Sequence, residues 1–135
     1  MAKTESPILA ESLCAVSELP RSLIYRNNTG QGWQGKRMDT PVGEYVRVVP
    51  GMVILADARP VRFGLVGSGD MMGTVEGFAV AGETKTLTGP QREGQKLFQM
   101  AWQKAGGIYV LARSAQDMVN GIVQCVKEKQ AATKV

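Results

Sequence analysis

A chain of 135 residues, of which 44% are apolar and 21% charged, is long enough for one domain with its own hydrophobic core. It contains no histidine, which excludes every His-based catalytic triad and every zinc site with a His ligand. The net charge of +4 permits a nucleic-acid partner without requiring one. No apolar segment is long enough to span a bilayer or to form a signal peptide, so we expect a cytoplasmic protein with no membrane partner.

The first half of the chain is expected to hold one helix, one short strand and a hairpin. Ser6 before Pro7 predicts a helix over residues 7–18 with Ser6 as its N-cap. The apolar run at 23–25 predicts a strand, and the polar segment at 26–32 predicts a loop. Two further runs, residues 45–49 and 52–55, predict strands joined by a turn at Pro50 and Gly51.

The second half has clearer periodicity. Strands are predicted at 71–75 and 78–86, joined by the two-residue turn Glu76-Gly77, and at 108–111. A helix is predicted at 91–105, and a second at 115–127, capped by Ser114 and followed by a flexible tail at 128–135. The residues expected to be buried are Leu97, Phe98, Ala101, Trp102 and Ala105 on the first of these helices, and Met118, Ile122 and Val126 on the second.

This order of elements predicts an α/β fold with a mixed central sheet flanked by helices. The sequence has no internal repeat and no linker, so we expect a single domain over residues 1–135, with its core at about 5–127. Cys14 and Cys125 both fall in apolar-periodic segments, which favours buried, unpaired thiols over a disulfide.

Two carboxylates are expected to meet where the central hairpin opens. Counting outward from the Glu76-Gly77 turn, Val75 faces Phe78 and Asp70 faces Glu83, and Lys85 lies on the same face of its strand as Glu83. Paired carboxylates repel each other unless a cation lies between them, and Mg²⁺ is often held by such a pair. The pattern therefore favours a metal site, with an ordinary polar strand surface as the alternative.

Gln95 shares a helical stripe with Phe98 and Trp102, so its side chain should point toward the sheet. Its partner is either the backbone of the neighbouring loop or a residue of the active site. Basic and amide residues gather before Asp70 and indicate a phosphate-contacting surface, with a solvated charged face as the alternative. Trp33, in the same region, either stacks on a base or packs locally.

Several short motifs follow one another in a fixed order. They are Leu-Pro at 19–20, Tyr-Arg-Asn-Asn-Thr-Gly at 25–30, Arg-Phe-Gly at 62–64, Gly-Ser-Gly-Asp at 67–70, Glu-Thr-Lys at 83–85, Gln-Lys-Leu-Phe at 95–98, and Gly-Gly-Ile-Tyr-Val at 106–110. This ordered set resembles the VRR-NUC nucleases of the PD-(D/E)xK superfamily, in their stand-alone phage and bacterial form. The resemblance covers about residues 5–122.

The resemblance implies a restriction-endonuclease-like αβββαβ core with an added C-terminal helix. It implies that Asp70, Glu83 and the carbonyl of Thr84 bind Mg²⁺ or Mn²⁺, and that Lys85 positions water or stabilises the transition state. Gln95 would support the site, and a glutamate of the first helix would join it, with Glu5 as first choice and Glu11 as second. The expected DNA-binding residues are Arg26, Asn27, Asn28, Lys36, Arg37 and Arg62.

The implied activity is hydrolysis of DNA phosphodiester bonds by a structure-selective endonuclease, acting as a homodimer on four-way (Holliday) junctions or other branched DNA. The rival interpretation is a non-catalytic DNA-binding module that keeps the nuclease fold. A third, a small-molecule enzyme, requires a deep apolar pocket. Two departures from the family pattern stand out: Gly82 occupies a position that is usually bulky and apolar, and residues 36–58 are longer than in small members.

Overall fold

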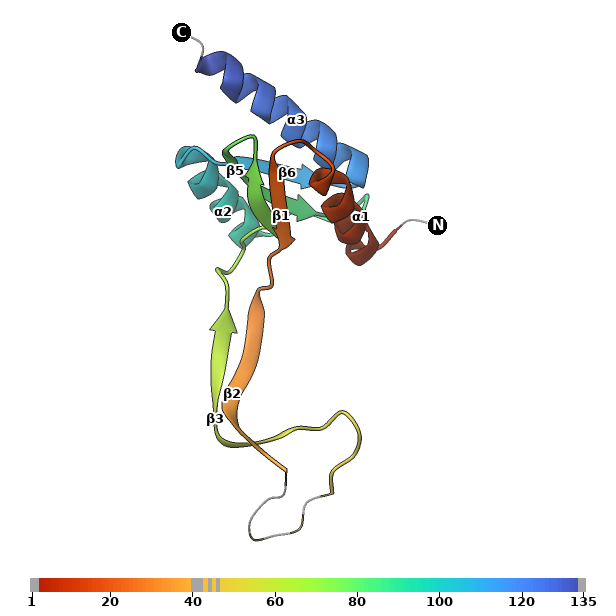
Figure 1. The fold of residues 1–135 in the computed structure, drawn as a ribbon, viewed down its shortest axis with the longest axis vertical. Coiled ribbons are helices and arrows are strands. Elements are labelled where there is room, and N and C mark those ends of the chain that lie inside the picture. The colour runs from red at the N-terminus through yellow and green to blue at the C-terminus, as the bar shows by residue number, and fades with distance from the viewer. Residues whose placement is uncertain (1–2, 40–42, 44, 46, 134–135) are drawn as a thin grey trace. The chain divides into compact units, whose positions relative to one another are not determined.

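The computed structural model describes residues 3–39, 43, 45 and 47–133. The chain forms two compact units, one comprising Met1–Asn28 and Leu65–Val135 and the other Thr29–Gly64 (Figure 1). The described residues form three helices, a four-stranded mixed sheet and a two-stranded sheet. The fold is therefore of the α/β class, as the sequence predicts.

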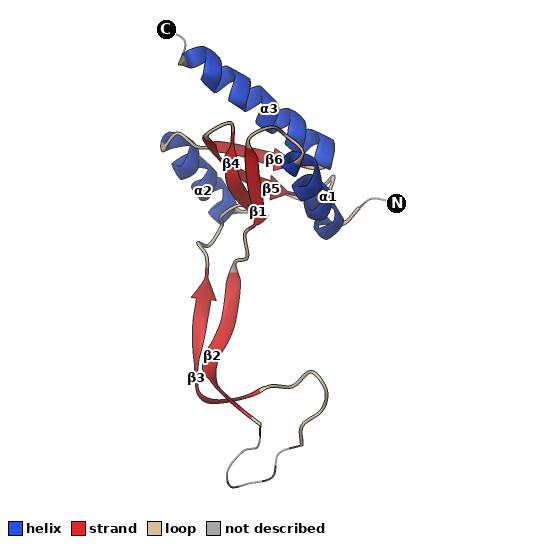
Figure 2. Ribbon diagram, viewed as in Figure 1, coloured by secondary structure: helices blue, strands red, loops and turns tan. Residues whose placement is uncertain are grey.

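The first unit is built on a sheet with strand order β1-β4-β5-β6 (Figure 2). The strands are β1 (Ser22–Arg26), β4 (Met71–Val75), β5 (Phe78–Thr84) and β6 (Ile108–Ala112). The first three are antiparallel, and β5 and β6 are parallel, which makes the sheet mixed. These strands and the Glu76-Gly77 turn confirm the predicted elements, and Val75 pairs with Phe78 as the counting requires.

Three helices accompany this sheet: α1 (Glu5–Ser17), α2 (Glu93–Lys104) and α3 (Ala115–Ala132). None of the helices in the described part of the chain is long and apolar enough to cross a membrane. Four predicted ends in the first unit are wrong by two residues or more: β5 ends at Thr84 rather than Thr86, α2 begins at Glu93 rather than Gln91, and one end each of α1 and α3 differs. The N-cap of α1 is Thr4 rather than Ser6, which leaves Pro7 in the first turn, where its missing N–H has no intrahelical partner to lose. Residues 128–132 continue α3, supported by the Gln124–Glu128 side-chain hydrogen bond of 3.1 Å.

The hydrophobic core lies between the sheet and the α1/α3 layer. It contains Met71, Val80 and Ile108 of the sheet with Val16 of α1, and the predicted Met118, Ile122 and Val126 of α3 are all buried. Cys14 lies on the outer side of α1 and is exposed, which corrects the expectation of a buried thiol. Cys125 is half-buried, and both thiols are free, as expected.

The second helix covers the opposite face of the sheet, because Gly82 of β5 adjoins Met118 of α3 whereas the next residue, Glu83, bonds to Gln95 of α2. No residue of α2 is buried. Phe98 and Trp102 are half-buried and stack at a centroid distance of 5.5 Å, but Leu97, Ala101 and Ala105 are exposed, contrary to prediction. The periodicity predicted the correct stripe of the helix, but it overestimated how deeply the side chains of that stripe are buried.

The second unit is a two-stranded antiparallel ribbon of β2 (Gly30–Met38) and β3 (Ile54–Phe63). Neither strand contains a buried residue. The structure contradicts the predicted hairpin: the described residues of 45–49 form no strand, and the strand that begins at Ile54 pairs instead with Gly30–Met38. Only the first three residues of that partner fall in the predicted loop at 26–32, and no element was predicted for the others. Val46 lies outside the described residues.

Candidate active site

A glycine-rich loop brings Asp70 to the mouth of the central hairpin. Gly67 has a φ of 82°, a backbone conformation that favours glycine. It packs against the backbone of Gly94 at the start of α2, so that a Cβ at this position would collide with the Gly94 carbonyl. A Cβ on Gly69 would lie 2.8 Å from the carbonyl oxygen of Gly82. The loop therefore packs directly onto the backbone of β5 and α2. This packing fixes the position of Asp70, the residue that follows the loop.

Asp70 and Glu83 lie one step beyond the last ladder pair, Met71–Gly82. The Asp70 carboxylate oxygen Oδ2 accepts hydrogen bonds from the backbone N–H and the hydroxyl of Thr84, both at 2.9 Å. Thr84 is thus tied to Asp70 through its donors, and its carbonyl stays a predicted metal ligand. The two strands hold the two carboxylates at the same end of the sheet, as the counting from the turn indicates.

Glu83 is the most constrained acidic group of the site, with only 2% of its surface exposed. Its Oε1 accepts a hydrogen bond from Gln95 Nε2 at 2.5 Å and lies 3.8 Å from Lys85 Nζ, whereas its Oε2 is buried without a hydrogen-bond partner. Burial and the neighbouring Asp70 charge raise the pKa of Glu83 to about 8, against an opposing effect of Lys85. A buried carboxylate with one unused oxygen is stabilised by a cation at that oxygen.

Lys85 is buried and lies between two carboxylates. Its Nζ is 3.8 Å from Oε1 of Glu83 and 3.8 Å from Oε1 of Glu5, at the start of α1. Glu11, the second choice for the helix glutamate, instead bonds to Lys3 at 2.7 Å. Of the two candidate glutamates, Glu5 is therefore the one that the structure brings to Lys85.

Gln95 has both of the partners between which the sequence left the choice open. Its Oε1 accepts the backbone N–H of Arg92 at 2.8 Å, which caps the start of α2, while its Nε2 donates to Glu83. An amide anchored at one end to the backbone delivers its other end at a fixed angle. Gln95 therefore fixes the orientation of the Glu83 carboxylate.

Tyr109 is a residue near the site that sequence reasoning missed. It is buried on β6, and its hydroxyl accepts a hydrogen bond from Gln91 Nε2 at 3.2 Å. Burial raises the pKa of Tyr109 to about 12, and the Glu83 and Asp70 charges act in the same direction. The hydroxyl therefore remains protonated near neutral pH. Its apolar neighbours in the sequence, Ile108 and Val110, concealed this placement.

Asn27 has a structural role that the sequence did not indicate. Its backbone N–H donates to the Asp70 carbonyl at 2.8 Å, and its side-chain Nδ2 donates to Ser68 Oγ at 2.8 Å and to the Gly69 carbonyl at 2.9 Å. The amide of Asn27 thus bonds to the loop that carries Asp70, and its contact with DNA stays a prediction. Asn27 is a positioning residue for that carboxylate.

Replacing Asn27 by Ala is expected to lower the stability by about 1–2 kcal/mol, because two side-chain hydrogen bonds are lost. If the protein cleaves DNA, the turnover number should fall roughly 10- to 100-fold with little change in KM, because a loosened Asp70 affects the reaction rather than binding. Asn27→Asp, which has the same size but lacks the donor, should behave in the same way. A loss of DNA affinity in an Asp70→Asn background would instead indicate a direct contact between Asn27 and DNA.

The other predicted DNA-binding residues divide between the two units. Arg26 and Asn28 are exposed at and beyond the end of β1, in the first unit. Lys36 and Arg37 lie on β2 and Arg62 on β3 of the ribbon, and all three are exposed. Exposure leaves each of these five side chains available to a ligand.

The donor set fits a hard divalent cation. Asp70 and Glu83 supply carboxylate oxygens, and the buried, unpartnered Oε2 of Glu83 is the observation that calls for a positive ligand. Within residues 3–39, 43, 45 and 47–133, no group of three or more acidic or cysteine side chains is arranged to hold a metal. An ion held by two carboxylates would complete its coordination with carbonyl oxygens and water, as Mg²⁺ commonly does.

Gly82, the departure from the family pattern, has a local explanation. A Cβ at this position would lie 2.8 Å from Met118 Cε and Sδ and 2.8 Å from Met71 Cγ. The two methionines occupy the space that a bulky residue would fill.

This explanation predicts a coupled pair of substitutions. Gly82→Val should lower the free energy of unfolding by about 1–3 kcal/mol through overpacking. Met118→Ala alone should cost about 2–5 kcal/mol, and the double variant should cost clearly less than the sum, since the new side chain fills the vacated space. Urea denaturation measures all three, with Ala79→Val on the exposed side of β5 as control. Additive effects would refute the account.

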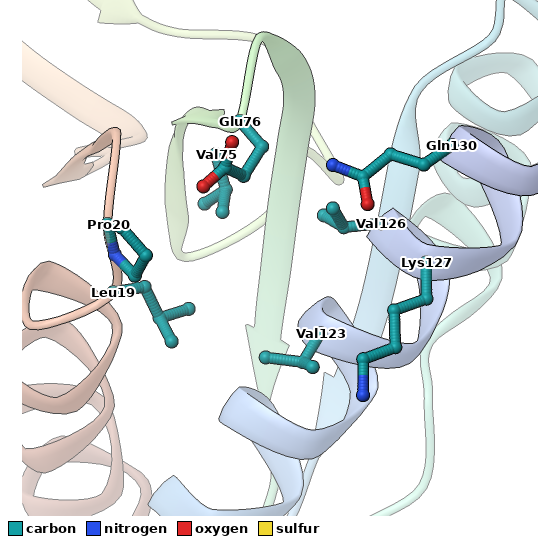
Figure 3. A pocket seen from close by; sticks show the side chains of 8 residues that line it. All are labelled: Leu19, Pro20, Val75, Glu76, Val123, Val126, Lys127 and Gln130. Atoms are coloured by element: carbon teal, nitrogen blue, oxygen red, sulfur yellow. The ribbon is translucent and has the colours of Figure 1, made fainter. Parts of the chain in front are cut away.

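Two cavities lie apart from the carboxylates. The first, of about 320 Å³, is bounded by the α1–β1 and β4–β5 turns and by α3; Figure 3 shows Leu19, Val75 and Val126 facing the same space. The second, of about 310 Å³, is lined by Met72, Phe98 and Trp102 and reaches Asn27 and Ser68. Neither is lined by Asp70, Glu83 or Lys85, so neither provides a small-molecule pocket over the acidic site.

Comparison with known proteins leaves the family unassigned. A scan against protein-family models finds no match to the chain, and a search of curated protein sequences finds no significant match either.

Proposed function

We propose that the protein is a metal-dependent, structure-selective DNA endonuclease that hydrolyses phosphodiester bonds. One observation carries the proposal: the buried carboxylate of Glu83 has an unpartnered oxygen beside Asp70, with Lys85 next to it. Two acidic side chains and a lysine at the end of a sheet form a set suited to phosphoryl chemistry, since they supply a cation site and a charge for the phosphate.

The architecture of the first unit supports a restriction-endonuclease-like core. Its elements run helix, three antiparallel strands, helix, parallel strand and helix, which is the αβββαβ order with an added C-terminal helix. The ribbon is inserted between the first and second of these strands. The resemblance to VRR-NUC nucleases includes Glu83, Lys85 and Gln95, and both Lys85 and Gln95 lie against the Glu83 carboxylate.

Each residue of the site has a role in this proposal. Asp70, Glu83 and the carbonyl of Thr84 would hold Mg²⁺ or Mn²⁺, and the bound ion would supply the charge that lowers the pKa of water and neutralises developing negative charge. Gln95 and Thr84 orient the two carboxylates through the hydrogen bonds described above. Lys85 presents its ammonium group to the scissile phosphate, and Glu5 holds that group from the other side.

A cleavage assay tests the function directly. The protein should cut four-way junctions, and other branched DNA more weakly, in Mg²⁺ or Mn²⁺ and not in EDTA. Asp70→Asn should reduce the rate by roughly 100- to 1,000-fold or more, because the cation site loses a charged ligand. Asp117→Asn, a helix-capping position on α3, is the matched control. Binding of branched DNA without cleavage in either metal would instead establish a non-catalytic DNA-binding module.

Cutting both strands of a junction symmetrically calls for two sites related by a two-fold axis, so we also propose a homodimer. Light scattering at micromolar concentration should give twice the mass of the 14.5 kDa chain. A monomer both with and without junction DNA would contradict the dimer and leave the hydrolytic chemistry standing.

A further inference from the structure

The ribbon of the second unit has two long, regularly paired strands but no buried side chains. Its strands contain nine and ten residues, yet none of these residues is buried. An isolated two-stranded ribbon is only marginally stable in water, because it has no second layer to cover its side chains. Side chains that form no core are available to bind something else.

One face of the ribbon combines an aromatic ring with two arginines. The register pairs Trp33 with Pro60 and Gln31 with Arg62, and the alternation along β2 places Arg37 on the same face as Trp33. The indole of Trp33 is 66% exposed, so it is not packed in a core. This face, defined here as Gln31, Trp33, Arg37, Pro60 and Arg62, is the aromatic face.

The paired strands are strongly basic. They carry Lys36, Arg37, Arg59 and Arg62 against one acidic residue, Asp57, which has a φ of 53° at the irregularity in β3. Arg59 bonds only weakly to the neutral Gln34, at 3.4 Å. Among the described residues, none of the ion pairs involves any of these four cations. Their charge is therefore available to a polyanion.

A nucleic acid with an unstacked base fits both the exposed indole of Trp33 and the basic side chains of the ribbon. Arginines on the two strands can contact phosphates, and an exposed indole offers a stacking surface that any unpaired base can use. A base within intact duplex is already stacked on its neighbours and cannot occupy that surface. Branched DNA offers both a continuous backbone and bases that are unstacked at the branch.

We propose that the aromatic face binds branched DNA, with Arg37 and Arg62 on the phosphate backbone and Trp33 stacked on a base that is left unstacked at the branch. The proposal rests on the proposed function in one respect, namely that DNA is the substrate. It assigns the preference for branched structures to the ribbon, and it requires no catalysis by Asp70 or Glu83.

Equilibrium binding tests this without cleavage, using the full chain with Asp70→Asn in EDTA. The probes are a four-way junction, a fork with single-stranded arms and a plain duplex of equal length. Trp33→Ala should weaken binding to the fork and the junction by roughly 5- to 150-fold and leave duplex binding unchanged. Trp33→Phe should restore most of the loss, because the smaller ring still stacks.

The arginines should act on all three probes alike. Arg37→Ala with Arg62→Ala should reduce the slope of log affinity against log salt by roughly 2, about one for each phosphate contact. Lys104→Ala with Lys127→Ala, which removes two exposed charges from the first unit, is the matched control and should change the slope less. Circular dichroism of each variant checks that the fold is retained.

The outcomes separate this inference from the proposed function. Equal losses on duplex and branched probes for Trp33→Ala, or an unchanged salt slope for the arginine pair, overturn the role of the ribbon even if the wild type cleaves. If the wild-type protein prefers branched DNA through Trp33 but never cuts it, the proposed endonuclease activity is refuted and the proposed role of the ribbon is supported.

Discussion

Replacing Glu83 by Gln is expected to stabilise the metal-free protein at pH 8–9 and to abolish cleavage. The pKa of Glu83 is raised from 4.5 to about 8 in the folded state, mainly by burial. A raised folded pKa means that the native fold favours the protonated carboxyl. Glutamine resembles that neutral form and can still accept the hydrogen bond from Gln95 through its amide oxygen.

The sign of the pH dependence follows from linkage. Below about pH 4.5 Glu83 is protonated in both states, and the wild type has its full stability. As the pH rises toward 8, the unfolded chain loses this proton more readily than the folded one, so the wild type is progressively destabilised. The Glu83→Gln variant does not share this loss. Its advantage should therefore grow between pH 4.5 and 8, to about 2–4 kcal/mol, and then level off.

Urea denaturation at pH 4.5, 6, 8 and 9 in EDTA measures this difference. Glu18→Gln, which removes an exposed carboxylate after α1, is the matched control. A Glu83→Gln advantage that stays flat or shrinks with pH would show that Glu83 is ionised at little cost in the fold.

The same pair of proteins tests the metal site. A divalent cation that binds only the native state raises its stability with increasing concentration. Mn²⁺ should therefore raise the melting temperature of the wild type, and the Glu83→Gln variant should lose most of that rise together with its cleavage activity. Equal shifts in both proteins would place the cation elsewhere.

The sequence predicted which residues of the candidate site lie together because their placement depends on local rules. A two-residue turn at Glu76-Gly77 sets the register of β4 and β5, and the register alone brings Asp70 next to Glu83. The helical stripe of Gln95 set the direction of its side chain in the same way. These inferences needed no knowledge of distant parts of the chain.

The ribbon escaped prediction because strand periodicity records burial on one side. Both faces of β2 and β3 are open, so the chain shows no alternation of apolar and polar residues there, and glycines at 30, 32 and 35 resemble a loop. The apolar run at 52–55 led to a predicted strand that begins two residues before β3. The positioning role of Asn27 was missed for a different reason: its partners, Ser68 and Gly69, are distant in sequence, and pattern reasoning cannot supply them.

Replacing Lys85 by Met is expected to reduce cleavage by on the order of 100- to 10,000-fold while leaving metal binding in place. Methionine approximates the length of the buried lysine stem, so the packing of β5 changes little. What disappears is the ammonium group that lies 3.8 Å from both Glu83 and Glu5.

The two carboxylates then lose their counter-charge. Because Lys85 lowers the pKa of Glu83, its removal should raise that pKa further and make the metal-free variant less stable at pH 8. Added Mn²⁺ should restore more stability to Lys85→Met than to the wild type. A cation at the unpartnered oxygen Oε2 of Glu83 compensates for the lysine charge that was removed from the side of Oε1. This combination, a stronger response to metal with weaker cleavage, distinguishes a lysine that acts on the phosphate from one that only neutralises the site. Were Lys85 merely a counter-charge, cleavage would return to the wild-type rate once Mn²⁺ saturates the variant.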